Sequence, residues 1–198
     1  MEYNPFKKKI SDLNYLQPQA GLTLVAEPFM EDDYFKRAVV LLTEYNEKGA
    51  VGFILNTKLD LNVGDVMDDF PEFDAPLFLG GPVEPQSLFY IHCVPELIPN
   101  SIKISDFLHW NGDFEILKRH IKSGEINPRQ IKFFLGYSGW GLQQLKDELE
   151  LNSWIIQEVP GQVVLSNEAE YLWKEVILNS TNREISQMAH FPKDPSLN

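Results

Sequence analysis

A lone serine lies between two glycines in the stretch Gly136–Trp140, which reads GYSGW. The stretch follows an apolar strand pattern and precedes a helical pattern, the setting in which hydrolases hold a nucleophilic serine on a strained turn. Such a turn needs small residues two positions before and two positions after the serine. Gly136 meets the first requirement, but Trp140 violates the second. The pattern therefore favours a glycine-permitted tight turn that places Trp140 in the core or at the rim of a pocket.

A serine hydrolase that uses Ser138 with His92 stays open as an alternative. It requires the serine hydroxyl within hydrogen-bond reach of the imidazole, with oxyanion donors nearby. His92 lies in an apolar strand pattern without a carboxylate or serine partner close in sequence, which favours a satisfied core or rim histidine over a general base. A buried Ser138 hydroxyl, or its separation from every histidine, would remove this alternative. We therefore assign no catalytic residue. Whether the protein is an enzyme stays open, and the sequence favours a protein without catalytic activity.

Two further segments carry groups that could bind a ligand. The loop Gly80–Val83 (GGPV) could hold an anion through backbone N–H groups, but its proline removes one donor and no lysine, serine or threonine follows. Asn56 ends a hairpin strand, where it can bond its own turn or serve as a polar group of a pocket. If the 80–83 and 136–140 segments meet in space, they would form a shallow binding surface. The candidate residues are Asn56, Gly80, Gly81, Pro82, His92, Tyr137, Ser138 and Trp140.

Residues that commonly bind metals lack ligand spacing. The chain has one cysteine, Cys93, which excludes an internal disulfide and a paired-cysteine zinc site. Acidic clusters could hold a hard cation, but solvated carboxylates are the more common case. We expect neither a metal nor a cofactor. The residues weighed are His109, His120, His190, Glu31, Asp32, Asp33, Asp65, Asp68 and Asp69.

The formal net charge is −12 and the sequence pI is near 4.7. A surface this acidic repels phosphate backbones and anionic lipid, so binding to either would need a local basic patch. The lysine run at positions 7–9 is interpreted as a solvated tail, and a second basic group as a solvated helix face. No helix-turn-helix pattern with a basic recognition helix is present. We expect a protein or small-molecule partner rather than nucleic acid or membrane. The second basic group is Lys118, Arg119, Lys122, Arg129 and Lys132.

The length of 198 residues fits one domain, and a hydrophobic content of 43% is that of ordinary globular proteins. The N-terminus lacks the apolar core of a secretory signal, and the apolar runs are far shorter than the ~20 residues that span a bilayer. These features predict a cytoplasmic protein.

The strand patterns come in hairpins and runs, with helices inserted between them, which favours an α+β fold. The clearest hairpin joins Ala38–Tyr45 to Ala50–Leu55, and Gly52 in its second arm indicates a bulge or a close backbone approach. Helices are expected over Val63–Phe70 and from Asp113 to Gly124. Two more are expected, over 142–151 and from an Asn167 cap to about residue 179.

Several of these segments, in this order and spacing, resemble the AlgH/YqgE family of small bacterial proteins. The resemblance covers roughly residues 20–175. It rests on Gly21–Pro28, Phe35, Arg37–Asn46, Gly49–Asn56, Gly80–Val83, Leu88–His92, Leu135–Trp140, Gln144, Leu145, Glu148 and Trp154.

The resemblance implies an α+β domain whose bent, branched, mainly antiparallel β-sheet curls into a partial barrel with flanking helices. We expect a single domain over 19–180, an N-terminal extension over 1–18 that packs as a short helix, and a loosely ordered C-terminal tail over 181–198. The family's activity is largely uncharacterised, and its label as a transcriptional regulator comes without a recognised DNA-binding motif. The function is therefore unknown. The preferred interpretation is a non-catalytic binding or regulatory domain, and a transcriptional regulator remains a second alternative beside the hydrolase.

Overall fold

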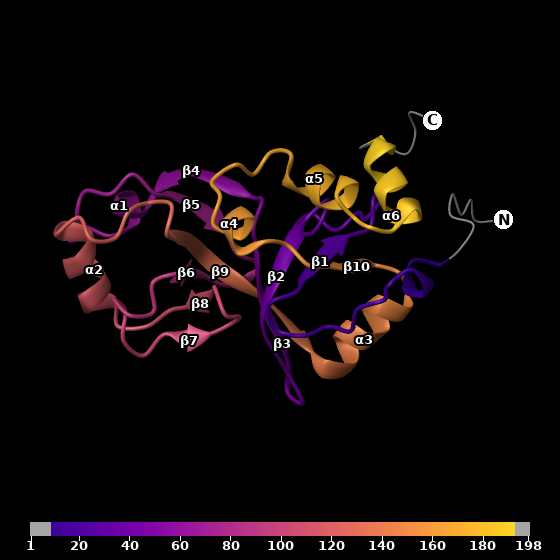
Figure 1. Ribbon diagram of the computed structural model, residues 1–198, viewed down its shortest axis with the longest axis horizontal. Coiled ribbons are helices and arrows are strands. Elements are labelled where there is room, and N and C mark those ends of the chain that lie inside the picture. Colours follow the sequence, from indigo (N-terminus) through magenta and orange to yellow (C-terminus); the bar gives the residue numbers. More distant parts are fainter. Residues whose placement is uncertain (1–8, 193–198) are drawn as a thin grey trace.

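The computed structural model describes residues 9–192, which form an α+β fold around one ten-stranded sheet (Figure 1). The strands are β1 (Thr23–Ala26), β2 (Val39–Asn46), β3 (Gly49–Ile54), β4 (Lys58–Asn62), β5 (Pro76–Leu79), β6 (Val83–His92), β7 (Ile102–Lys103), β8 (His109–Trp110), β9 (Ile131–Gly141) and β10 (Trp154–Gln157). The helices are α1 (Val63–Val66), α2 (Phe114–Lys122), α3 (Leu142–Glu150), α4 (Gly161–Val164), α5 (Leu172–Leu178) and α6 (Arg183–Gln187), with short 3-10 turns η1 (Ile10–Asp12) and η2 (Met188–His190).

The sheet is branched at β9. Its main path runs β10-β1-β2-β3-β9-β6-β8-β7, and β4 joins through β5, which pairs with β9 beside β3. Every pairing is antiparallel except that of β5 with β9. The path ends at β10 and β7, so the sheet does not close. The predicted α+β class with a branched, mainly antiparallel sheet is confirmed.

Strand β9 is longer than the sequence indicates, and it connects the two halves of the molecule (Figure 1). Its first part pairs with β6 and β5, while its last four residues pair with β3 in the register Gly52↔Ser138 to Gly49↔Gly141. The stretch Gly136–Trp140 is therefore part of a strand, and the prediction of a tight turn there is wrong. The glycine at 136 has a φ of +67°, so it bends the strand instead of ending it.

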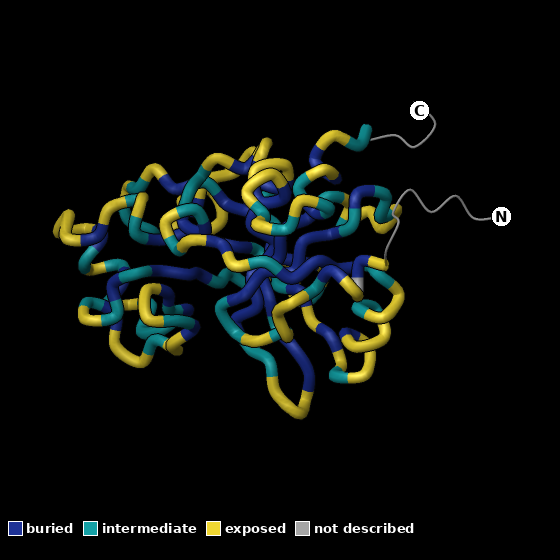
Figure 2. Tube along the Cα trace, turned by 45° about the vertical axis from the view of Figure 1, so that its right-hand side comes forward, coloured by how far each residue is buried: buried dark blue, intermediate teal, exposed yellow. Residues whose placement is uncertain are grey.

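The predicted hairpin is present as β2 and β3, and its exposed tip projects from the lower edge of the molecule (Figure 2). Gly52 lies opposite Leu42, and the register shifts between Leu42 and Glu44. A Cβ atom on Gly52 would lie 2.7 Å from the carbonyl oxygen of Leu41. The close backbone approach expected at Gly52 is therefore confirmed, whereas the extra residue of the bulge, Thr43, lies in the partner strand β2.

The central strands β1, β2 and β3 are largely buried on both faces because helices cover each side. Helix α3 packs Leu145 against one face, where alternate residues of β1 and β2 meet Trp140 and Trp154. The α5–α6 segment covers the opposite face with Trp173, Ile177 and other apolar residues. Helix α2 covers a third cluster in the half of the molecule that holds β5 and β6. Since β9 contributes to all three clusters, it anchors the fold.

Two helix boundaries differ from the sequence prediction. Helix α1 ends at Val66, four residues earlier than expected, because Met67 is already extended. Helix α5 begins at Leu172, and Asn167 does not cap it, because buried Ala169 and Leu172 hold the preceding loop against the core. The Asp113 cap of α2 is confirmed, with its carboxylate accepting a hydrogen bond of 3.0 Å from the amide of Ile116.

Both chain ends pack on the domain within the described residues. Ile10 of η1 is 2% exposed, consistent with an extension that packs as a short helical turn. The expected loose tail is wrong for residues 181–192, because α6 and η2 bury Ile185 and Met188 in the core. The guanidinium of Arg37 also donates hydrogen bonds of 2.7 Å to the carbonyls of residues 191 and 192. Positions 1–8 and 193–198 lie outside the described residues.

Candidate functional site

The two glycine segments lie in direct contact. The amide of Gly80 donates to the carbonyl of Leu135 at 2.8 Å, and its own carbonyl accepts from the amide of Ile54 at 3.0 Å. A Cβ atom on Gly81 would lie 2.4 Å from the backbone of Tyr137. The segments thus meet as packed backbone at the point where β9 exchanges β5 for β3. No space remains between them for a ligand.

Ser138 and His92 are far apart. The Ser138 hydroxyl is 0% exposed and donates a hydrogen bond of 3.0 Å to the carbonyl of Gly80. His92 pairs with Ile131 at the other end of β9, seven positions before Ser138. At about 3.3 Å per residue this is a separation of roughly 23 Å. A buried serine without an imidazole in reach removes the hydrolase alternative.

His92 is a satisfied core histidine. Its Nε2 lies 3.0 Å from the carbonyl oxygen of Asn111, to which it donates, and its Nδ1 accepts from the amide of Val94 at 3.3 Å. Burial lowers the pKa of His92 to about 4, with the bond to Asn111 opposing that shift. The ring also stacks on His109 across the strand pair, with centroids 6.0 Å apart. At neutral pH the imidazole is therefore uncharged, and both of its ring nitrogens are hydrogen-bonded to the backbone.

Trp140 belongs to an aromatic cluster beneath α3. Its indole N–H and that of Trp154 donate to the same carboxylate oxygen of Glu148, at 2.9 Å and 2.7 Å. The other oxygen of Glu148 accepts from Gln144 at 3.0 Å. Phe35 packs against both indoles, with centroids 5.7 Å and 5.4 Å away. Trp140 is 5% exposed and therefore forms core rather than a pocket wall.

Of the remaining candidate residues, one is exposed on the surface and two pack or hydrogen-bond within the fold. Pro82 is exposed, and Tyr137 is half-buried with its ring packed edge-on against Phe89. Asn56 joins the two ends of the hairpin: its Oδ1 accepts from the amide of Val39 and its Nδ2 donates to the carbonyl of Arg37, each at 2.9 Å. Asn56 also lines a surface hollow.

Three hollows lie around Asn167, and each is lined by it. Their volumes are about 460, 400 and 500 Å³. We call their combined lining the Asn167 surface. The first hollow is lined by Asn56, Lys58 and residues 167–172 with Glu175; the second by residues 58–62 with Asp74, Pro76 and Asn167; the third by Phe107, Arg129, Gln162 and residues 165–168.

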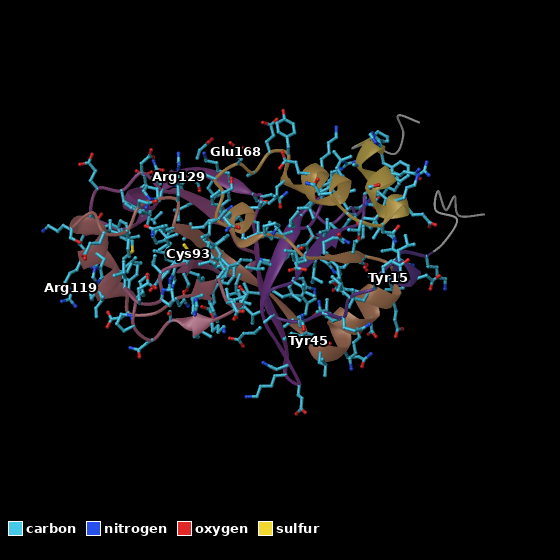
Figure 3. All side chains as sticks on the ribbon, viewed as in Figure 1. Tyr15, Tyr45, Cys93, Arg119, Arg129 and Glu168 are labelled. Carbon is cyan, nitrogen blue, oxygen red and sulfur yellow. The ribbon has the colours of Figure 1, made fainter. Side chains whose placement is uncertain are left out.

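The side-chain amide of Asn167 is half-buried and has no hydrogen-bond partner among residues 9–192. An amide offers two donors and two acceptor lone pairs, so it can bind polar groups in any of the three hollows. Arg129 and Glu168 lie on the same side of the molecule and line the third hollow together (Figure 3). The polar, unpaired amide at the centre makes this surface the best candidate binding site.

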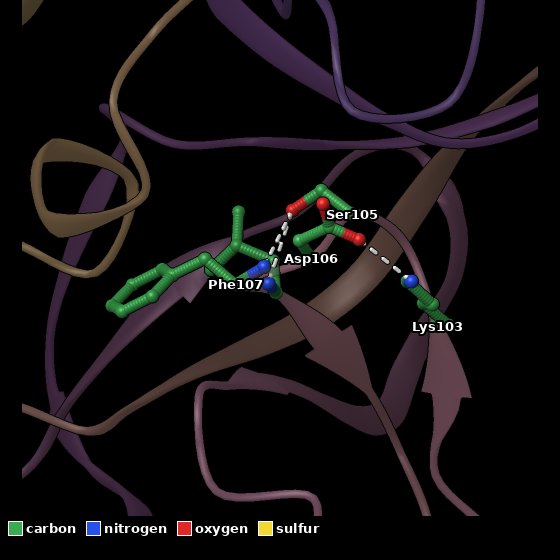
Figure 4. A network of polar contacts seen from close by, with 5 residues as sticks. Lys103, Ser105, Asp106 and Phe107 are labelled. Atoms are coloured by element: carbon green, nitrogen blue, oxygen red, sulfur yellow. Dashed lines mark hydrogen bonds and ion pairs between the residues drawn. The ribbon is translucent and has the colours of Figure 1, made fainter.

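A turn between β7 and β8 brings Phe107 to the third hollow. The hydroxyl oxygen of Ser105 accepts from the amides of Phe107 and Leu108 at 3.3 Å and 3.0 Å, and an ion pair of 2.7 Å joins Lys103 to Asp106 (Figure 4). The Phe107 ring points away from this network, and a Cβ atom on Gly161 would lie 2.2 Å from it. The turn therefore seats an aromatic ring against the start of α4, at the edge of the surface.

Lys132 is buried beneath the same loop. It is 1% exposed, and its Nζ donates to the carbonyl of Ser166 at 2.6 Å and lies 3.9 Å from the centroid of the Phe78 ring. Burial alone lowers the pKa of Lys132 to about 7. The expectation that Lys132 lies on a solvated helix face is wrong, because the residue is on β9 and faces the core. The ammonium holds the backbone directly before Asn167.

The part of the chain that the structure describes contains no group of three histidine, cysteine or carboxylate side chains placed to hold a metal ion. Among the described helices, none is long and apolar enough to cross a membrane.

The family profile described as AlgH-like matches residues 23–183. The chain belongs to the AlgH-like family. Curated relatives of similar length include a UPF0301 protein of Parabacteroides distasonis, 43% identical over 93% of this chain and 94% of its own, and one of Cytophaga hutchinsonii, 41% identical over 90% and 98%.

Two solved structures share the AlgH-like fold. A crystal structure of a Corynebacterium diphtheriae protein has a TM-score of 0.76 at 22% identity, covering 94% of this chain and all of that one. The solution structure of AlgH from Pseudomonas aeruginosa has a TM-score of 0.68 at 22% identity, covering 96% and 98%. At this identity the likeness establishes the fold and nothing about activity.

The residues that identify this AlgH-like chain are mainly structural. Gly80, Gly136 and Trp140 form the junction at β9, and Glu148 with Trp154 fixes α3 on the sheet. The Asn167 surface draws mainly on β4 and the α4–α5 loop, and of the identifying residues Asn56 lines it. The alternation of charged and apolar residues in Lys58–Asn62 could have indicated an edge strand. Nothing in the sequence brings that strand to residues 167–172.

Proposed function

We propose that this AlgH-like protein is a non-catalytic binding domain that acts through a protein or small-molecule partner at the Asn167 surface. The observation that carries the proposal is the unpaired amide of Asn167 at the meeting point of three hollows. Ligand sites in proteins combine concave surface with a few convergent polar groups. The glycine segments, the first choice from sequence, instead serve to shape the sheet.

A regulatory role through DNA receives less support. Of the five scattered basic residues, Lys132 is buried, and Lys118 is paired with Asp69 and Glu115 at 2.7 and 2.8 Å. Of this group, Arg119, Lys122 and Arg129 remain for phosphate contacts, beside the carboxylates of Glu72 and Glu115 that line the same hollow as Arg119 and Lys122, while affinity for nucleic acid depends on several cations acting together. A transcriptional role would then have to run through another protein.

The test compares partners captured from an extract of the native host by tagged full-length chain and by two variants. Asn167→Trp removes the central amide and places a bulky ring where the hollows meet, and Gln143→Trp introduces the same ring on the exposed face of α3, away from the surface. We expect one defined partner to be lost with Asn167→Trp and retained with Gln143→Trp, at equal thermal stability. Retention of every captured species by Asn167→Trp contradicts the proposal.

A further inference from the structure

Carboxylates outnumber cations on the Asn167 surface by five to two. All five are exposed, and none forms an ion pair with another described residue. Lys58 and Arg129 are the two cations. Unpaired surface carboxylates steer and retain partners of opposite charge. The five are Asp60, Asp74, Glu168, Glu170 and Glu175.

Each hollow also presents one large apolar side chain to solvent. Tyr171 is 62% exposed in the first hollow, Leu61 41% in the second and Phe107 40% in the third. Exposed apolar residues that gather around polar hollows mark interaction surfaces. Aromatic rings beside carboxylates also suit lysine and arginine, whose cationic heads pack on ring faces. The surface thus combines apolar anchors with an acidic rim.

The strand along the second hollow has an unpaired edge. Within residues 9–192, strand β4 pairs only with β5, and all five of its residues line that hollow. An exposed strand edge accepts an added strand, with main-chain hydrogen bonds giving affinity and neighbouring pockets giving specificity. A partner segment lying there would be extended, with alternate side chains reaching towards Asn167.

We propose that the Asn167 surface binds an extended segment of a partner protein that carries basic and apolar side chains and pairs with the open edge of β4. This inference rests on the proposed function and adds the class of partner. Charge excludes an acidic segment and nucleic acid, and the exposed apolar residues favour a segment with apolar side chains over a purely cationic one.

The experiment selects random peptides displayed on phage against the full-length chain and measures the affinity of the selected peptides for two variants. One variant carries Glu168→Gln, Glu170→Gln and Glu175→Gln. The matched control carries Glu31→Gln, Glu47→Gln and Glu150→Gln, three exposed carboxylates elsewhere on the molecule. Hydrogen exchange then locates the amides that each peptide protects.

We expect selected peptides with net positive charge and apolar residues, bound about tenfold more weakly by the first variant and almost unchanged by the control. Amides of β4 should exchange more slowly in the complex. Peptides without positive charge, equal weakening by both variants, protection elsewhere, or no selected peptide each overturn the inference. If Asn167→Trp still abolishes capture of a host partner, the proposed function survives and only the partner class is wrong.

Discussion

The hydroxyl of Ser138 donates a hydrogen bond of 3.0 Å to the carbonyl oxygen of Gly80, across the junction where β9 changes neighbours. The same carbonyl accepts from the amide of Ile54. The serine that looks most reactive in the sequence is therefore a second donor to an already bonded carbonyl. Its role is to hold β9 against the end of β5.

Ser138→Ala should reduce the stability of the protein only slightly, because the carbonyl of Gly80 keeps its hydrogen bond from the amide of Ile54. We expect a loss of about 1 kcal/mol in the free energy of unfolding, measured by urea denaturation, and unchanged partner capture. A variant that folds with near-normal stability yet loses its partner would return Ser138 to the functional site.

Glu148→Ala should be more damaging, since it leaves the buried indole N–H groups of Trp140 and Trp154 without their acceptor. We expect a loss of about 2–4 kcal/mol, with a red shift of tryptophan fluorescence as water reaches the cluster. Glu150→Ala, on the exposed face of the same helix, is the control and should change stability by less than about 0.5 kcal/mol. Equal losses in the two variants would contradict the assigned role of Glu148.

His92 makes stability depend on pH in the acid range. Its pKa is about 4 in the folded state against 6.5 for the unperturbed side chain, so between these values the unfolded chain binds more protons. The contribution of the neutral imidazole to the free energy of unfolding is complete above pH 6.5 and is lost as the pH falls towards 4. It amounts to at most roughly 3 kcal/mol. Unfolding measured across this range should show a shallower pH slope in His92→Gln. Identical slopes would show that the imidazole is not held neutral.

Lys132→Met should stabilise the protein. At pH 6 the wild-type amine is charged in both states, so the full cost of burying that charge is present. Between pH 7 and 10.5 the folded chain has released the proton that the unfolded chain keeps, and wild-type stability rises. We expect a gain of about 1–3 kcal/mol at pH 6 that shrinks by pH 10. The exposed Lys122→Met is the control. A loss of stability at pH 6 would mean that the bond to Ser166 outweighs the burial cost.

The sequence predicts what depends on local pattern. The β2–β3 hairpin, the Asp113 cap of α2 and the close approach at Gly52 follow from turn residues, capping residues and missing side chains. These effects act over a few neighbouring positions, so they are visible without the fold.

Prediction from the sequence fails where the structure of a residue depends on a partner distant in the chain. Gly136 reads as a turn residue, but pairing with β3 and contact with Gly81 carry the strand through it. Lys132 reads as a surface cation because the loop that covers it lies 34 positions further along the chain. The Asn167 surface joins segments more than a hundred residues apart for the same reason, so its position could not be read from local pattern.

The central claim, that the protein works through the Asn167 surface, is tested most directly by photo-crosslinking in the native host. A benzoylphenylalanine replaces either Tyr171, which lines that surface, or Tyr15, which is 79% exposed in a separate hollow beside β10 (Figure 3). We expect a discrete adduct, weighed by mass spectrometry of the intact chain, from position 171 and none from position 15. An adduct from position 15 alone, or from neither, would contradict the account.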